Sequence, residues 1–339
     1  MTTVHALAAT DAGAELKPFE YDLPERLGPT DVDIAVTHCG ICHSDLSMLD
    51  NEWGIAQYPL VPGHEIVGTV VAKGEMVKHL QLGQRVGLGV FSDCCMTCRH
   101  CIGGDHNLCP EAQLTFVGRH GGFADRVRAS QQWVIPIPDT LDQAKIGPLL
   151  CGGLTVFNPI TQFNVRPTDR VGVIGIGGLG HLALQFLAKW GCEVTAFTST
   201  GSKMEEARRM GAHRCVDSRS DKALEEEVGR HDFILSTVNV PLNWDAYCNA
   251  LAPGGRLHVV GAVLEPIPFN SFPMFIGQKS ISGSPVGSPG TTVDMLDFCA
   301  RHDIAPVTEH YKMSQVNDAM QHLRDGKARY RIVLENDLG

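Results

Sequence analysis

Residues 170–190 read RVGVIGIGGLGHLALQFLAKW, and this stretch decides the fold. A short apolar run leads into a glycine-rich turn, and a helical pattern of apolar residues follows the turn. In a dinucleotide-binding turn the first glycine permits a tight bend, the second lets the backbone approach a pyrophosphate, and the third brings helix and strand close together. The alternative is a plain glycine-rich connection between a strand and a helix. We expect a cofactor-binding turn formed by Gly175, Gly177, Gly178, Leu179 and Gly180.

The position that would contact the cofactor ribose follows a second predicted strand, Glu193 to Phe197. Enzymes that use NAD place Asp or Glu about 20 residues after the glycines to hold the ribose 2′-hydroxyl, whereas this chain has Thr198. Small hydroxyls and the charge of Lys203 suit the 2′-phosphate of NADP. The alternative is an exposed polar helix start, with Ser202 as the N-cap of a helix over 203–210. We expect NADP(H) to be favoured over NAD(H), held by Thr198, Ser199, Thr200 and Lys203.

Two different patterns divide the chain. Strand-like and helix-like segments alternate after residue 170, which predicts a doubly wound parallel sheet of the Rossmann kind. Earlier residues instead alternate apolar and polar positions between turns, as Val32 to Val36 do, which predicts antiparallel β structure. We therefore expect an α/β protein with a barrel-like, mostly β domain of residues 1–152 and 288–339 and a Rossmann domain of residues 153–287.

Composition narrows the class of protein. The 339 residues are more than one hydrophobic core usually holds, and 43% of them are hydrophobic. The net charge of -10 disfavours a nucleic-acid partner, because binding to phosphate backbones depends on basic patches. The sequence starts without a signal-peptide pattern and has no apolar stretch long enough for a membrane span. We expect a cytoplasmic enzyme that acts on a small molecule and binds neither nucleic acid nor membrane.

Five of the twelve cysteines fall within one short segment. Four of them follow a spacing of two, two and seven intervening residues, and four thiolates on short loops can converge on one tetrahedral Zn²⁺. The alternative is a cluster of reduced or redox-active cysteines. Cys94 is one cysteine too many, either a bystander or a substitute for its neighbour. We expect a structural zinc ion held by Cys95, Cys98, Cys101 and Cys109.

A second set of metal-binding residue types is spread over more than 100 residues. Residues 39–45 read CGICHSD, residues 63–65 read GHE, and Cys151 lies further on. Two thiolates and one imidazole leave a fourth zinc position open for water or a substrate oxygen. Taken alone, His64 could be a hydrogen-bonded loop histidine and Cys151 a small buried hydrophobe.

With these motifs in this order, the chain resembles the zinc-dependent medium-chain alcohol dehydrogenases over nearly its whole length. Within them it is similar to the cinnamyl-alcohol-dehydrogenase-like branch, in which hydroxyl residues replace the ribose acid. The resemblance implies a GroES-like catalytic domain beside the Rossmann domain and two Zn²⁺ ions per chain, one catalytic and one structural. It also implies NADP-dependent interconversion of primary alcohols and aldehydes, with apolar or aromatic substrates favoured.

The resemblance also implies roles for single residues. Ligands of the catalytic zinc ion would be Cys42, His64 and Cys151, with Glu65 entering during ligand exchange. Asp45 would orient the His64 ring, Ser44 would contact the substrate oxygen and start the proton path, and His43 would lie near the cofactor phosphates. Trp53 and Phe91 would line the substrate pocket.

This chain departs from the relatives at two positions. Ser47 stands where many of them carry a proton-relaying histidine, and Pro285 stands where aromatic-alcohol relatives have a pocket phenylalanine. These departures leave open a reductase of C=N or conjugated C=C bonds on the same scaffold, and a third reading is a catalytically silent nucleotide-binding protein. The resemblance further implies a homodimer joined through the Rossmann sheet edge near 280–286, or a homotetramer.

Overall fold

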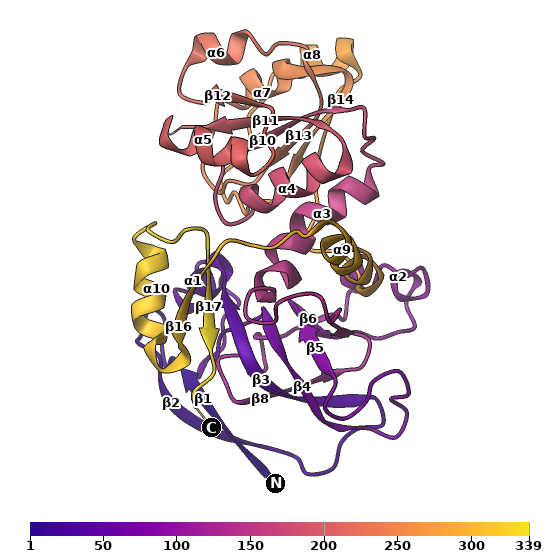
Figure 1. The fold of residues 1–339 in the computed structure, drawn as a ribbon, viewed down its shortest axis with the longest axis vertical. Coiled ribbons are helices and arrows are strands. Elements are labelled where there is room, and N and C mark those ends of the chain that lie inside the picture. Colours follow the sequence, from indigo (N-terminus) through magenta and orange to yellow (C-terminus); the bar gives the residue numbers. More distant parts are fainter. Residues whose placement is uncertain (200, 339) are drawn as a thin grey trace. The chain divides into compact units, whose positions relative to one another are not determined.

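A computed structural model describes residues 1–199 and 201–338, and the chain forms two compact units (Figure 1). The larger unit consists of Met1–Leu154 and Gly287–Gly339, and the smaller unit of Thr155–Val286. These limits lie within two residues of the domain limits expected from the sequence. Within the described residues, no helix combines the length and the apolar character needed to cross a lipid bilayer.

The smaller unit is built on a six-stranded parallel sheet with the order β12-β11-β10-β13-β14-β15. The strand order runs outward from β10 in one direction and then in the other, which is the doubly wound arrangement expected from the sequence. The strands are β10 (Arg170–Ile174), β11 (Glu193–Thr198), β12 (Arg214–Asp217), β13 (His231–Ser236), β14 (Leu251–Val259) and β15 (Ser280–Gly283). The helices are α3 (Gly152–Gln162), which starts in the larger unit, α4 (Gly180–Trp190), α5 (Gly201–Arg209), α6 (Asp221–Glu225), α7 (Trp244–Ala250) and α8 (Ser271–Gly277).

Local sequence explains the central strand and its helix. Residues 171–174 of β10 are all buried, as expected for a strand of a parallel sheet that is covered on both faces. Helix α4 ends where Gly191 adopts φ 109°, a left-handed conformation that stops a helix. Ser202, the N-cap in the alternative interpretation of this segment, lies within the first turn of α5, because the helix already begins at Gly201.

The larger unit contains a seven-stranded sheet with the order β16-β17-β3-β4-β5-β9, and β8 also pairs with β3. Its strands are β3 (Asp31–Ile41), β4 (Ile66–Lys73), β5 (Arg85–Leu88), β8 (Arg126–Ser130), β9 (Val134–Pro136), β16 (Thr308–Lys312) and β17 (Arg331–Glu335). Two small sheets pair β1 (Thr2–Ala8) with β2 (Lys17–Leu23) and β6 (Phe91–Asp93) with β7 (Gln113–Leu114). The predominance of antiparallel strands agrees with the predicted β domain.

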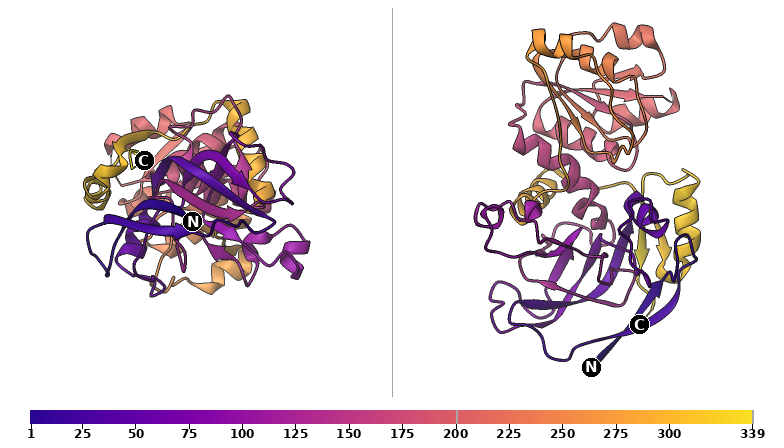
Figure 2. Two further views of the ribbon diagram at one scale, coloured as in Figure 1. Left: turned by 90° about the horizontal axis from the view of Figure 1, so that it is seen from below. Right: turned by 180° about the vertical axis from the view of Figure 1, so that it is seen from behind.

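Helices of the larger unit are short except for two near the C-terminus. They are α1 (His43–Leu49), α2 (Arg99–Ile102), α9 (Pro289–His302) and α10 (Val316–Arg324), with single turns η1 (His106–Leu108), η2 (Gly147–Leu150) and η3 (Met313–Gln315). β17 runs antiparallel to β3, so the C-terminal segment lies beside residues from the first 50 (Figure 2). This pairing confirms the expected return of the last segment to the first domain.

Candidate active site and metal centres

Asp45 connects two of the predicted metal-binding segments. Strand β3 ends next to Cys42, which is the N-cap of α1, and Asp45 lies in the first turn of that helix. Its Oδ2 accepts a hydrogen bond from the Cys42 backbone N–H (2.9 Å), and its Oδ1 accepts one from the Gly63 N–H (2.9 Å). The same Oδ1 lies 3.0 Å from Nδ1 of His64. One buried carboxylate therefore orients the imidazole and fixes both loops.

The ligand atoms of Cys42, His64, Glu65 and Cys151 all lie within 4.8 Å of one another, and all four residues are buried. His64 Nε2 lies 3.3 Å from Cys151 Sγ, which lies 3.9 Å from Cys42 Sγ. In a tetrahedral site with Zn–S bonds of about 2.3 Å, two sulfur atoms are about 3.8 Å apart. The donor set and its spacing therefore fit a zinc ion.

Among the ionisable groups of this set, the Cys42 thiol has the pKa shift that favours binding of a cation. The pKa of the Cys42 thiol is well below its usual value, because Cys151 donates a hydrogen bond to it and Arg331 is close, against the effect of burial. Burial alone would lower the pKa of His64, but the charge and hydrogen bond of Asp45 raise it well above the usual value. Burial raises the pKa of Glu65 to about 7, although Arg331 opposes this.

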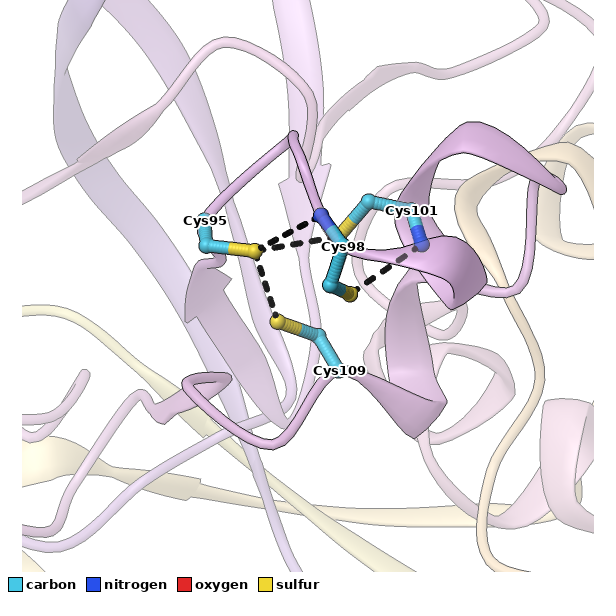
Figure 3. A group of neighbouring side chains, drawn as sticks. All are labelled: Cys95, Cys98, Cys101 and Cys109. Atoms are coloured by element: carbon cyan, nitrogen blue, oxygen red, sulfur yellow. Dashed lines mark hydrogen bonds between the residues drawn. The ribbon is translucent and has the colours of Figure 1, made fainter.

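The four-cysteine cluster is formed by Cys101 within α2, Cys98 at its N-cap, Cys109 at the end of η1, and Cys95 on the preceding loop (Figure 3). Cys95 Sγ lies 3.5 Å from Cys109 Sγ and 4.0 Å from Cys101 Sγ. These two distances bracket the sulfur–sulfur distance of about 3.8 Å expected in a tetrahedral zinc site. Backbone N–H groups of Cys98 and Cys101 point at the sulfur atoms of Cys95 and Cys98, as they would at thiolates. Cys94 stays outside this group of four, its Sγ 3.4 Å from Met96 Sδ. All twelve cysteines are free of disulfides.

The glycine turn between β10 and α4 has the geometry that a bound pyrophosphate requires. Gly175 adopts φ +85°, and a Cβ on Gly180 would lie 1.8 Å from the Gly175 carbonyl oxygen. A Cβ on Gly177 would meet nothing within 4 Å, so this side of the turn is open. Thr237 Oγ1 donates to the carbonyls of Ile174 and Gly175 and holds the turn from below.

The predicted ribose-contacting residues lie at the end of β11 and on α5. Thr198 is buried and pairs in register with Asp217, whereas Ser199 is exposed. Lys203 Nζ donates to the carbonyl of Ile176 at 3.2 Å, so its charge already reaches the glycine turn. Thr200, the fourth predicted residue, lies outside the described residues.

Comparison with known proteins agrees with this geometry. The alcohol dehydrogenase GroES-like domain family matches residues 28–139, and the zinc-binding dehydrogenase family matches residues 178–301. The chain is 55% identical over 333 residues to the aldehyde reductase AdhA of Synechocystis, covering 98% of this chain and 99% of that protein. The chain belongs to the zinc-dependent medium-chain alcohol dehydrogenases. Within this family it is of the cinnamyl-alcohol-dehydrogenase-like branch.

Solved structures of other medium-chain alcohol dehydrogenases have the same two-domain fold. A cinnamyl alcohol dehydrogenase of Sorghum bicolor superposes with a TM-score of 0.95 at 36% identity, over 100% of this chain and 99% of that one. A cinnamyl alcohol dehydrogenase of Helicobacter pylori complexed with NADP(H) superposes with a TM-score of 0.89 at 28% identity, over 98% of both chains. The predicted fold class and family are confirmed.

Sequence reasoning missed one residue of this dehydrogenase's buried site. Arg331, the first residue of β17, forms an ion pair with Oε1 of Glu65, and both side chains are almost fully buried. The pKa of Arg331 is raised because the negative charge of Glu65 outweighs the effect of burial. Oε2 of Glu65 has no hydrogen-bond partner. One oxygen of this carboxylate is therefore neutralised while the other is available to a cation.

The residues predicted to contact the substrate oxygen and to relay its proton lie on α1. Ser44 Oγ lies 3.6 Å from Cys42 Sγ and is half-buried, whereas His43 is exposed. Ser47 follows three residues later and is buried, so helical geometry puts it on the same face as Ser44. The structure thus brings two hydroxyl groups to one side of the helix that starts at Cys42, a predicted zinc ligand.

The three predicted pocket residues of this dehydrogenase have different surroundings. Trp53 packs against a cluster of Met48, Leu60 and Phe116, and the Phe116 ring stacks on His64 with centroids 4.7 Å apart. Phe91 instead packs on Trp133, with centroids 5.1 Å apart. Pro285 is exposed just after β15. Phe116 was not predicted, and it contacts both Trp53 and His64, a predicted metal ligand.

Proposed function

We propose that this dehydrogenase reduces apolar or aromatic aldehydes to primary alcohols, and reverses the reaction, with NADP(H) at a zinc site of Cys42, His64 and Cys151. The observation that carries the proposal is the convergence of these three buried donors around the Asp45–His64 pair. Relatives named aldehyde reductase and cinnamyl alcohol dehydrogenase support it. A second zinc ion at the four-cysteine cluster has a structural role, because four protein thiolates leave no open position.

When bound, the zinc ion polarises the aldehyde oxygen and the reduced nicotinamide supplies hydride. The protein's own residues position the metal-binding side chains and deliver a proton to the substrate oxygen. Asp45 holds the His64 ring with Nε2 toward Cys151. Ser44 is placed to pass a proton to the substrate oxygen, and Ser47, with water, replaces the histidine relay of other family members. Glu65, with one oxygen bound to Arg331, offers the other oxygen as a transient ligand.

The preference for NADP(H) rests on the end of β11 and on Lys203. No acidic side chain occupies positions 198–203, so the 2′-phosphate would meet no negative charge from this segment. The amino group of Lys203 already lies at the glycine turn. A related structure complexed with NADP(H) supports this preference.

We also propose a homodimer that forms through the outer edge of the smaller unit's sheet. Strand β15 is the last strand on that side. The adjoining α8 buries none of its residues, and Phe272, Phe275 and Ile276 are 67%, 77% and 65% exposed. Exposed apolar side chains grouped in this way typically mark an interface between proteins. Light scattering should give a dimer mass that Phe275→Asp converts to a monomer, whereas Leu82→Asp, at an exposed leucine of the larger unit, should leave it unchanged.

The reaction class is tested by a substrate panel with NADPH and NADH as reductants. The panel contains benzaldehyde and cinnamaldehyde, conjugated enones that carry no aldehyde, and cyclic iminium ions. NADPH-dependent reduction of the aldehydes to alcohols is the expected result. Exclusive turnover of the C=C or C=N substrates would replace the proposal with the alternative suggested by Ser47 and Pro285. Absence of any turnover on zinc-loaded protein would favour a silent nucleotide-binding protein.

A further inference from the structure

His258 is a polar residue in a strand position that is usually apolar. It lies within β14 and is fully buried. Its Nδ1 lies 2.9 Å from the hydroxyl of Ser282, its register partner on β15, and its Nε2 lies 2.9 Å from the hydroxyl of Ser284. Both ring nitrogens are therefore satisfied, which removes most of the penalty of burying the imidazole.

Residues that follow the incoming helix and precede the outgoing end of the smaller unit both contact this imidazole. The incoming segment is α3, which starts directly after the zinc ligand Cys151, and Phe163 just past its end packs on the His258 ring with centroids 5.0 Å apart. The outgoing segment includes Ser284, two residues before the unit ends at Val286. One side chain thus contacts residues near both ends of the smaller unit.

The imidazole is neutral at ordinary pH. Burial and the nearby Arg256 lower the pKa of His258 to about 4. A neutral imidazole has one N–H donor and one acceptor nitrogen, so one serine hydroxyl must donate to the ring and the other must accept from it. The guanidinium of Arg256 lies 4.2 Å from the centroid of the Phe163 ring, which also packs on His258.

We propose that His258 is a positioning residue that fixes Phe163 and Ser284, near the two ends of the Rossmann unit, and thereby sets the direction of the Ser284–Pro285 segment. Its kinetic consequence rests on the proposed function and on the predicted pocket role of Pro285. A leucine would fill the same volume, but it could not fix the direction of Ser284 or of the proline that follows. The two serines separate the effect on stability from the effect on the direction of the outgoing segment, because Ser282 lies within the sheet and Ser284 lies on that segment.

The kinetic test compares Ser284→Ala with its matched control Ser282→Ala. Each variant loses one hydrogen bond to the same imidazole, so the two should lower the melting temperature by similar amounts. Ser284→Ala should lower kcat/KM for benzaldehyde about five- to tenfold, the cost of one misdirected hydrogen bond, while Ser282→Ala stays within about twofold of wild type. Equal effects of the two variants on kcat/KM, or no effect of either, would overturn the proposal.

Hydrogen exchange tests the proposal independently of activity, on protein without NADPH. His258→Leu should speed amide exchange about tenfold in both 155–163 and 283–288, because both segments lose their common contact. Ser282→Ala should leave 155–163 as protected as in wild type. Changes confined to β15, or absent from both segments, would contradict the positioning role. If wild type reduces no aldehyde but the variants differ from it in exchange as expected, the proposed function fails and the positioning role stands. If His258→Leu does not fold, the comparison of Ser284→Ala with Ser282→Ala decides.

Discussion

Oδ1 of Asp45 lies 3.0 Å from Nδ1 of His64, with both side chains almost completely removed from solvent. A histidine that donates its second ring nitrogen to a carboxylate is held in one orientation and one tautomer, and its metal-binding nitrogen becomes more basic. Asp45 also bonds the backbone at Cys42 and at Gly63. The geometry of the proposed zinc site therefore depends on a residue that does not itself bind the metal.

Replacing Asp45 with Asn should weaken zinc binding and slow turnover. The amide keeps the size of the side chain but loses its charge, so we expect about 10- to 100-fold weaker zinc affinity in a chelator competition. Asp50→Asn is the matched control, because Asp50 caps the same helix and pairs with Arg324 at 2.6 Å and 3.0 Å. The control should lose a little stability and keep its zinc. Equal zinc affinity in the two variants would show that Asp45 only stabilises the fold.

Replacing Lys203 with Ala should affect NADPH and NADH differently. Loss of a cation near the 2′-phosphate should raise KM for NADPH about tenfold, the cost of one charge-assisted hydrogen bond, and leave KM for NADH nearly unchanged. Lys222→Ala, on α6 of the same unit, should change neither. Thr198→Asp should move the preference toward NADH by repelling the phosphate. An unchanged cofactor ratio in both variants would mean that the ribose pocket lies elsewhere.

Removal of Arg331 should destabilise the protein strongly. Arg331→Met leaves the Glu65 carboxylate buried without its partner, which costs about 3 kcal/mol of unfolding free energy. The double variant Arg331→Met with Glu65→Gln removes both charges and should recover most of this loss. Urea unfolding of the two variants checks the expectation. A double variant no more stable than the single one would indicate that packing of Arg331, rather than its charge, matters.

Stability should fall on mild acidification partly because of His258. Its folded-state pKa of about 4 lies below the unfolded value of about 6.5, so the unfolded state binds more protons as pH falls through this range. From pH 7 to pH 5.5 this linkage should cost the native state about 1 kcal/mol. Unfolding free energies of wild type and His258→Leu, measured at both pH values, give the difference. An identical pH dependence in both proteins would contradict the neutral, buried imidazole.

Local patterns were enough to predict the Rossmann fold and the four-cysteine set, whereas the set of Cys42, His64 and Cys151 was predicted from the family resemblance. The glycine turn of 175–180 and the four-cysteine spacing depend on neighbours in sequence, so a single stretch contains the whole signal. Arg331 was missed because its partner Glu65 is 266 residues away, and an arginine at the start of a strand is an ordinary surface residue in sequence. The cluster of His258 with Ser282 and Ser284 was missed for the same reason, since only the sheet register brings these polar residues together.

Zinc content combined with turnover tests the catalytic zinc site most directly. Wild type and Cys215→Ser, a control at a cysteine whose thiol donates a hydrogen bond to the Met204 carbonyl, should contain two zinc ions per chain and oxidise NADPH with benzaldehyde. Cys42→Ser should stay folded, contain one zinc ion and show no turnover, because the structural site is untouched and the catalytic donor set is broken. Two zinc ions with near-normal turnover in Cys42→Ser would contradict the assignment of the active site.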